Sequence, residues 1–295
     1  MAGTTSKAGF LAGIFHPELV RFSFRALRQN RKFLFALLAS LVPLVIGIVM
    51  FANEASTQNK PGSVFLPQYT GVVGGLILTG TVPFVALLLA GGMLADEVED
   101  RTLTYLLVRP IPRRVLYASK ALPVILTAAA LGAVQALLFG LCRLAAALTW
   151  GMHTQIPYKL AVPVPDPPTI GAPLLVLQVI PVAMVAAALV AALFAALFGL
   201  VSLLTTRFHF LANLIIFLAW EVPFGHLGGA SSYLTITYWG LSIAGSLDPT
   251  IGGMTSADAN VFVAVGWMLL WTGIWVWVGM KRIPKRNFNI TSAAT

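Results

Sequence analysis

The residues whose side chains could do chemistry fall into three small groups. Positions 96–101 read DEVEDR, with four acids and one arginine in six residues. Arg143 and Glu221 each interrupt a long apolar stretch, and His209 stands four residues before Asn213. A charge inside a membrane is costly and usually faces a partner, a cavity or an interface. The second group is therefore the one whose surroundings most need an explanation.

The composition indicates which solvent surrounds these groups. Of the 295 residues, 58% are hydrophobic and only 10% are charged, whereas a soluble domain carries about 25% charged residues. The mean hydropathy is +0.87. In lipid, an α-helix forms all of its backbone hydrogen bonds within the same segment, so we expect an all-α integral membrane protein. The net charge of +9 does not indicate nucleic acid, because the basic residues gather at the ends of apolar stretches, where anionic lipid attracts them.

Six apolar stretches are long enough for transmembrane helices, which need about 20 residues each. A further segment, Tyr233 to Leu247, is apolar but short. As a seventh crossing it would place the basic cluster at 281–286 outside, so we interpret it as a re-entrant outer segment before the last span. The six predicted spans cover residues 33–52, 71–95, 121–149, 173–206, 208–226 and 260–280.

The distribution of Lys and Arg predicts the orientation. With these spans, 16 of the 19 basic residues fall on one side. Only Lys60 and Lys159 lie on the other side, and Arg143 lies within a span. We therefore expect a multi-pass protein of the inner or plasma membrane, with both termini cytoplasmic and membrane lipid as a partner. No soluble domain is apparent.

An amphipathic helix is predicted before the first span, over residues 15–32. Its charged residues are spaced three or four apart and so form one stripe on a helix. A basic, aromatic helix of this type lies in the inner interface. It serves either as a topology anchor or as an elbow that leads into the first span and braces a partner subunit. The stripe consists of Glu18, Arg21, Arg25, Arg28 and Lys32.

The stretch from Asp96 to Lys120 connects the second and third predicted spans at the cytoplasmic face. Its acids suit a helix N-terminus, where negative charge is favoured. Residues 102–108 are amphipathic enough for a short helix, which Pro110 and Pro112 end. A short surface helix joined to two spans can transmit a push from a soluble motor into the membrane.

This segment resembles the intracellular coupling segment of ABC type-2 export permeases. The family pattern is an acidic residue, a Gly-Thr-Leu-like turn, a Leu-Leu pair, then Pro and Arg; Arg101 stands where the pattern usually has Gly. The elbow, the six spans and the re-entrant segment are similar to that family as well. The resemblance implies a coupling segment over residues 96–113, with contacts to an ATPase from Glu97, Arg101, Thr102, Leu106, Leu107, Pro110 and Arg113.

What the resemblance implies is a single transmembrane permease domain over residues 1–295. It would pair with a second permease, in a homodimer or heterodimer, and with two copies of a separate ATP-binding subunit. The chain itself would be no enzyme and hold no cofactor, with ATP and Mg in the partner ATPase. In agreement, the sequence has no G-x-x-x-x-G-K-[ST] phosphate loop, since none of its seven lysines follows a glycine. The apolar spans hint at an amphiphilic or lipid-like cargo.

Polar and aromatic residues inside the spans permit weaker expectations. Arg143 and Glu221 both fall in the outer half, where they would form a structural ion pair, snorkel to the interface, or contact cargo at an outer gate. Five polar side chains should hydrogen-bond between helices: Thr79, Thr81, Gln135, Gln178 and Asn213. Four tryptophans of the last span form a stripe that we interpret as lipid-facing or packing: Trp267, Trp271, Trp275 and Trp277.

Two other classes of function, an intramembrane protease and a secondary transporter, agree less well with the sequence. Asp96-Glu97-x-x-x-Arg101 and His209-x-x-x-Asn213 are similar to motifs of CAAX-type intramembrane proteases, but no histidine has the Phe four residues earlier that this family also carries. A secondary transporter would have inverted repeats and broken helices at the midplane, and the sequence shows no such symmetry. No metal site is expected, because the four histidines are scattered and H-E-x-x-H is absent.

Overall fold

The computed structural model is helical in every regular element that it describes. The described residues are 17–56, 72–93, 112–150, 172–205, 208–221, 223–224, 229–246 and 260–283. These ranges contain no strand. The prediction of an all-α fold is thus confirmed for this part of the chain. This is expected in lipid, which offers the backbone no hydrogen-bond partners, so that the bonds must form within each helix.

Within the described residues, five helical stretches are long and apolar enough to cross a membrane: 31–53, 72–90, 113–149, 176–204 and 261–282. They coincide with five of the six predicted spans, which makes the chain a multi-pass membrane protein. The elements that form them, in chain order, are α3 (Arg31–Ser40) with α4 (Val42–Ser56), the π-helix η1 (Val72–Thr81) with α6 (Val82–Ala90), α9 (Arg113–Trp150), α10 (Ala172–Leu204) and α15 (Val261–Arg282).

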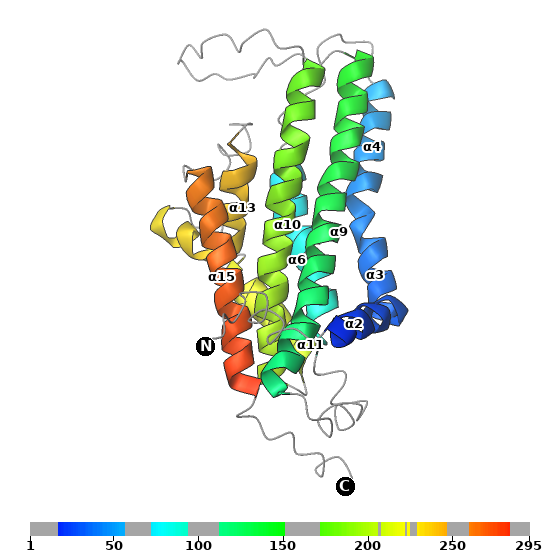
Figure 1. Ribbon diagram of the computed structural model, residues 1–295. Helices are drawn as coiled ribbons and strands as arrows, with labels where there is room; N and C mark the ends of the chain where they lie inside the picture. The colour runs from blue at the N-terminus through cyan, green and yellow to red at the C-terminus, as the bar shows by residue number, and fades with distance from the viewer. Residues whose placement is uncertain are drawn as a thin grey trace, which may run out of the picture.

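The predicted fifth span, 208–226, is represented by shorter pieces. α11 (His209–Ile216) continues into the π-helix η2 (Phe217–Glu221). Together they span 13 residues, or about 20 Å, less than the roughly 30 Å of a hydrocarbon core. The 3₁₀ helix η3 (Gly229–Leu234) and α13 (Ile236–Ala244) follow. In Figure 1, α10 ends at the bottom of the bundle, whereas α15 begins well above that point and runs back down.

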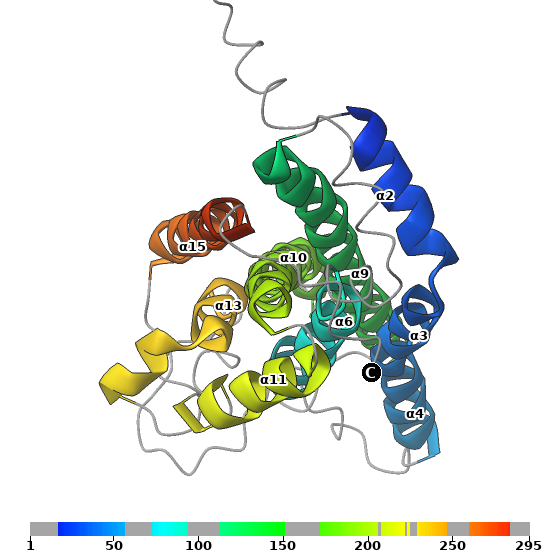
Figure 2. The same ribbon diagram turned by 90° about the horizontal axis from the view of Figure 1, so that it is seen from below.

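Helix α10 lies at the centre of the bundle, with α6, α9, α13 and α15 packed around it (Figure 2). In α10, 67% of the most apolar stretch is buried within the protein, against 11% in α15. The Ala-rich middle of α10 explains this position, because small residues let neighbouring helices approach closely.

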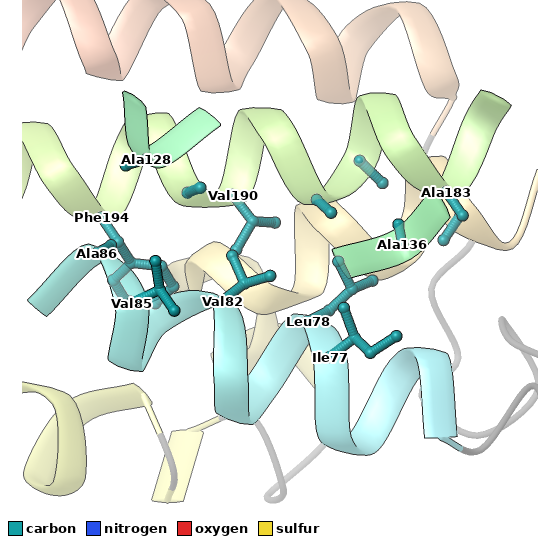
Figure 3. Close-up of a cluster of buried hydrophobic side chains, with 14 of the residues drawn as sticks. Ile77, Leu78, Val82, Val85, Ala86, Ala128, Ala136, Ala183, Val190 and Phe194 are labelled. Atoms are coloured by element: carbon teal, nitrogen blue, oxygen red, sulfur yellow. The ribbon is translucent and has the colours of Figure 1, made fainter. Parts of the chain in front are cut away.

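The centre of the core is built from small and branched side chains that interdigitate (Figure 3). Ile77 of η1 and Val82 of α6 face α10, where Val190 is also fully buried. Ala128 of α9 closes the cluster, and all four side chains are 0% exposed. Packing at this density leaves no space for an added methyl group without movement of a neighbour.

Helices α9 and α10 approach each other closely at Gly132. A Cβ placed on Gly132 would lie 2.7 Å from the carbonyl oxygen of Ala187, which is backbone and cannot rotate away. On α15, a Cβ at Gly266 meets nothing within 4 Å. The same substitution should therefore have different effects at these two positions.

We expect Gly132→Ala to destabilise the protein by about 1–3 kcal/mol, the usual effect of overpacking. The matched variant Gly266→Ala should stay within about 0.5 kcal/mol of wild type, as substitutions away from tight contacts do. Thermal unfolding of both variants in the same detergent measures the difference. Equal melting temperatures for the two would show that α9 and α10 do not approach as closely as described.

Helix α2 (Pro17–Gln29) lies at the lower end of the bundle (Figure 1), at its periphery beside α9 and α3 (Figure 2). Leu19 is buried in a small cluster with Tyr117 of α9 and Leu200 of α10. Arg21 and Arg25 are exposed. The side chain of Asn30 accepts a hydrogen bond of 2.9 Å from the backbone N–H of Lys32, which caps α3 and separates it from α2. The helix is thus amphipathic as predicted, but it ends at Gln29, so that Lys32 of the predicted stripe belongs to α3. Its role as an interfacial elbow stays a prediction.

An aromatic cavity around Glu221

Most of the predicted coupling segment lies outside the described residues. This applies to Glu97, Arg101, Thr102, Leu106, Leu107 and Pro110. Arg113 is described: it is the first residue of α9 and is exposed. It lies at the same end of the bundle as α2 and the last turn of α15 (Figure 1). The role of these residues in coupling stays a prediction.

Arg143 and Glu221 are both buried in the protein, with 2% and 5% of their surfaces exposed. The backbone N–H and the hydroxyl of Thr237 each donate a hydrogen bond to the Glu221 carboxylate. The ion pair between Arg143 and Glu221 therefore stays a prediction, and Glu221 has a structural role that the sequence did not indicate.

Glu221 caps the N-terminus of α13 from a distance of 16 residues along the chain. Its Oε1 accepts a hydrogen bond of 2.6 Å from the backbone N–H of Thr237 and one of 2.7 Å from its hydroxyl. Thr235, the residue before the helix, accepts a further bond of 3.4 Å from the N–H of Tyr238. The first turn of a helix has N–H groups without partners inside the helix, and a carboxylate is a strong acceptor for them. Glu221 thereby joins η2 to α13.

We expect Glu221→Ala to lower the free energy of unfolding by about 1–3 kcal/mol, because it leaves the buried N–H and hydroxyl of Thr237 without their acceptor. Glu221→Gln should cost less, since its amide oxygen can still accept both bonds. Melting temperatures of the two variants in detergent test this order. A Gln variant as unstable as the Ala variant would contradict the capping role.

A cavity of about 360 Å³ lies beside this cap. Five elements surround it: α10, the α11–η2 helix, η3, α13 and α15. Among the described residues of its wall, Glu221 is the only charged one. The lining residues are Leu193, Phe194, Leu197, Phe198, Ile216, Phe217, Trp220, Glu221, Tyr233, Leu234, Thr235, Ile236, Trp239, Trp267, Trp271 and Trp275.

Four of the tryptophans in this wall form a continuous ladder. The ring centroids of Trp239 and Trp267 are 5.5 Å apart, those of Trp267 and Trp271 5.8 Å, and those of Trp271 and Trp275 5.3 Å. These distances are in the range of favourable aromatic pairs. The predicted stripe of α15 is thus a packing surface for three of its four members. Trp277 is half-exposed outside the cavity, with Lys281 Nζ 3.7 Å from its ring centroid.

Two tryptophan side chains are held at the edge of the cavity by hydrogen bonds to η3. Trp239 donates its ring N–H to the carbonyl oxygen of Tyr233 at 3.0 Å. Trp220 donates to the carbonyl oxygen of Leu234 at 3.3 Å. These contacts fix the orientation of both rings, because indole has one polar atom and it is engaged. The cavity can receive an apolar body, and it offers aromatic faces and one carboxylate as specific contacts.

The predicted hydrogen bonds between helices are confirmed for Thr81, Gln135 and Asn213, whereas the Thr79 hydroxyl donates to the carbonyl oxygen of Gly75 within its own helix. The Thr81 hydroxyl donates a hydrogen bond of 2.6 Å to Gln135, which joins η1 to α9. Asn213 is fully buried and its amide donates to the carbonyl oxygen of Phe198 at 3.4 Å, which joins α11 to α10. The asparagine of the protease-like motif thus has a structural role here.

One comparison with known proteins gives a match. The family model described as ABC-2 family transporter protein matches residues 19–164. This is about half of the chain, from the first turn of α2 to beyond the end of α9. The matched range includes the predicted coupling segment. No curated protein matches the chain.

Proposed function

The chain belongs to the ABC-2 transporter family through residues 19–164, and from this membership we propose that it is the permease subunit of an ATP-driven exporter. It would move a substrate across the membrane while a separate subunit hydrolyses ATP. The single observation that carries this proposal is the family match, which covers the first three spans and the loop that joins the second to the third.

The sequence has no phosphate-loop motif, which supports the proposal that a separate subunit hydrolyses ATP. No G-x-x-x-x-G-K-[ST] motif occurs among the 295 residues, so ATP and Mg would bind the partner. The exposed side chain of Arg113 lies where a subunit below the bundle would approach (Figure 1). By the same proposal the ATPase binds in two copies, one for each permease of a homodimer or heterodimer.

The proposed topology has six crossings in the inner or plasma membrane. The end of the bundle with α2, Arg113 and Lys281 would face the cytoplasm, because basic residues are retained there. The short helices between α10 and α15 would complete the sixth crossing. In this arrangement α13 is the re-entrant element, and the hydrogen bonds from Thr237 to Glu221 hold it in place.

Purification of the tagged chain from its native membranes tests the proposal. We expect an ATP-binding subunit to co-purify and the preparation to hydrolyse ATP, although the chain alone lacks a nucleotide site. The control is the same tag on an unrelated multi-pass protein from the same membranes. A preparation with no ATPase partner, but with transport driven by an ion gradient, would instead make the chain a secondary transporter.

A further inference from the structure

We propose that the aromatic cavity binds a lipophilic cation, namely an amphiphile whose quaternary ammonium group lies against the tryptophan faces and the Glu221 carboxylate. The inference deepens the proposed function: if the chain is a permease, this is the class of its cargo. The binding step itself rests on the cavity alone.

The size and lining of the cavity select a largely apolar ligand. Its volume of about 360 Å³ is at the lower end of small-molecule sites. The wall is made almost entirely of aliphatic and aromatic side chains from five elements. A ligand covered with hydrogen-bonding groups would lose its water and find few partners here. An alkyl chain would find contacts along most of the wall.

The charge of Glu221 determines which sign of ligand the described wall favours. Glu221 is 5% exposed, and its Oε1 accepts hydrogen bonds from Thr237. None of the described lining residues is Lys, Arg or His. A carboxylate repels an anionic amphiphile and attracts a cationic one.

The aromatic faces select a cation that needs no hydrogen bonds. Tryptophan is the best ring for cation–π contact, and this contact recognises quaternary ammonium groups. The wall contains five tryptophans, and four of them are the ladder from Trp239 to Trp275. The same helix already shows this type of contact, since Lys281 lies over Trp277 at 3.7 Å. A primary ammonium would require three acceptors, while a trimethylammonium group requires only faces and a counter-charge.

The site is held ready for its ligand by contacts that do not involve the ligand. The hydrogen bonds of Trp220 and Trp239 to η3 fix two rings. The two bonds from Thr237 fix the carboxylate. A preformed site loses less side-chain entropy on binding than a mobile one, which favours affinity.

The test measures binding of decyltrimethylammonium to the purified full-length chain in nanodiscs by titration calorimetry, with no ATPase present. Empty nanodiscs give the correction for partition into lipid, and decyl sulfate is the anionic probe of equal chain length. We expect saturable binding of the cation and none of the anion. Equal binding of both probes, or no saturable binding of the cation, would overturn the proposal.

Three variants locate the binding. Glu221→Gln keeps both accepted hydrogen bonds and removes the charge, so it should raise the dissociation constant of the cation at least tenfold. Trp271→Leu should raise this constant severalfold. Trp277→Leu, on the same helix but outside the cavity, should leave it unchanged. Melting temperatures check that each variant is folded. Wild-type affinity in Glu221→Gln, or equal losses in both tryptophan variants, would contradict the assignment. A failed titration would overturn the cation site but not the proposed association with an ATPase. A failed co-purification would overturn the proposed function but not a measured binding of the cation.

Discussion

Replacement of Leu106 and Leu107 together by alanine should abolish ATP-driven transport while the protein still inserts into the membrane. Both lie in the segment that resembles the coupling helix of ABC type-2 permeases, within the residues that the family model matches. Truncation of an apolar side chain at the centre of an interface costs about 2 kcal/mol or more. Two such losses would reduce association with the ATPase by two to three orders of magnitude, since each 1.4 kcal/mol is a factor of about ten.

The measurement is co-purification of the ATPase with the tagged double variant, together with transport in the same membranes. Leu37→Ala with Leu38→Ala is the matched control, because these leucines are 41% and 53% exposed on α3, in a span rather than in the loop. Loss of the same two side chains there should leave association intact. Wild-type association and transport in the Leu106–Leu107 variant would mean that this loop does not couple.

Charge changes in the same loop should be mild by comparison. Glu97 and Arg101 are four residues apart, so on a helix they can form an exposed pair worth about 0.2–0.5 kcal/mol. This is several times less than the expected effect of the two leucines. The contrast between apolar and charged variants therefore distinguishes an apolar socket on the ATPase from an electrostatic contact.

Hydropathy sufficed for five spans because length and apolarity are local properties of the chain. The predicted first span, 33–52, coincides with the apolar helix 31–53, and the last, 260–280, with 261–282. No knowledge of the neighbours was needed, since lipid imposes the same requirement on every such segment. The helix that contains the third predicted span is longer than that span, because α9 begins at Arg113, before the apolar stretch.

The fifth span shows where the local argument stops. The prediction ran to residue 226, but the apolar helix ends at Glu221. Pro223 follows two residues later, and proline cannot donate the next helical hydrogen bond. Hydropathy detects the apolar character of this region but not its division into α11, η2, η3 and α13.

The site could be predicted only as separate residues. The sequence singled out Glu221 as a costly charge, but the donors that satisfy it belong to Thr237, on another helix. Trp267, Trp271 and Trp275 are four residues apart, which places them on one face of α15. Nothing in that spacing shows that Trp239 continues the ladder. Contacts between helices distant in sequence are set by packing, which one sequence does not display.

Single cysteines placed at the two ends of the bundle should differ completely in their reaction with a thiol reagent added outside the cell. In a Cys142→Ala background, Thr149→Cys should react with an impermeant thiol reagent, while Gln29→Cys and Arg282→Cys should not. All three positions are exposed on the protein. Gln29 and Arg282 lie at the lower end of the bundle, and Thr149 lies near the upper end of α9 (Figure 1).

This labelling also decides whether the short helices complete a crossing. With six crossings Gln29 and Arg282 are on the same side, and the positive-inside rule makes that side cytoplasmic. With only the five long helices, they would be on opposite sides. Permeabilised cells are the control, in which all three cysteines should react. Outside labelling of Arg282→Cys in intact cells, with Gln29→Cys protected, would show that the chain from α11 to α13 enters the membrane and returns without crossing it.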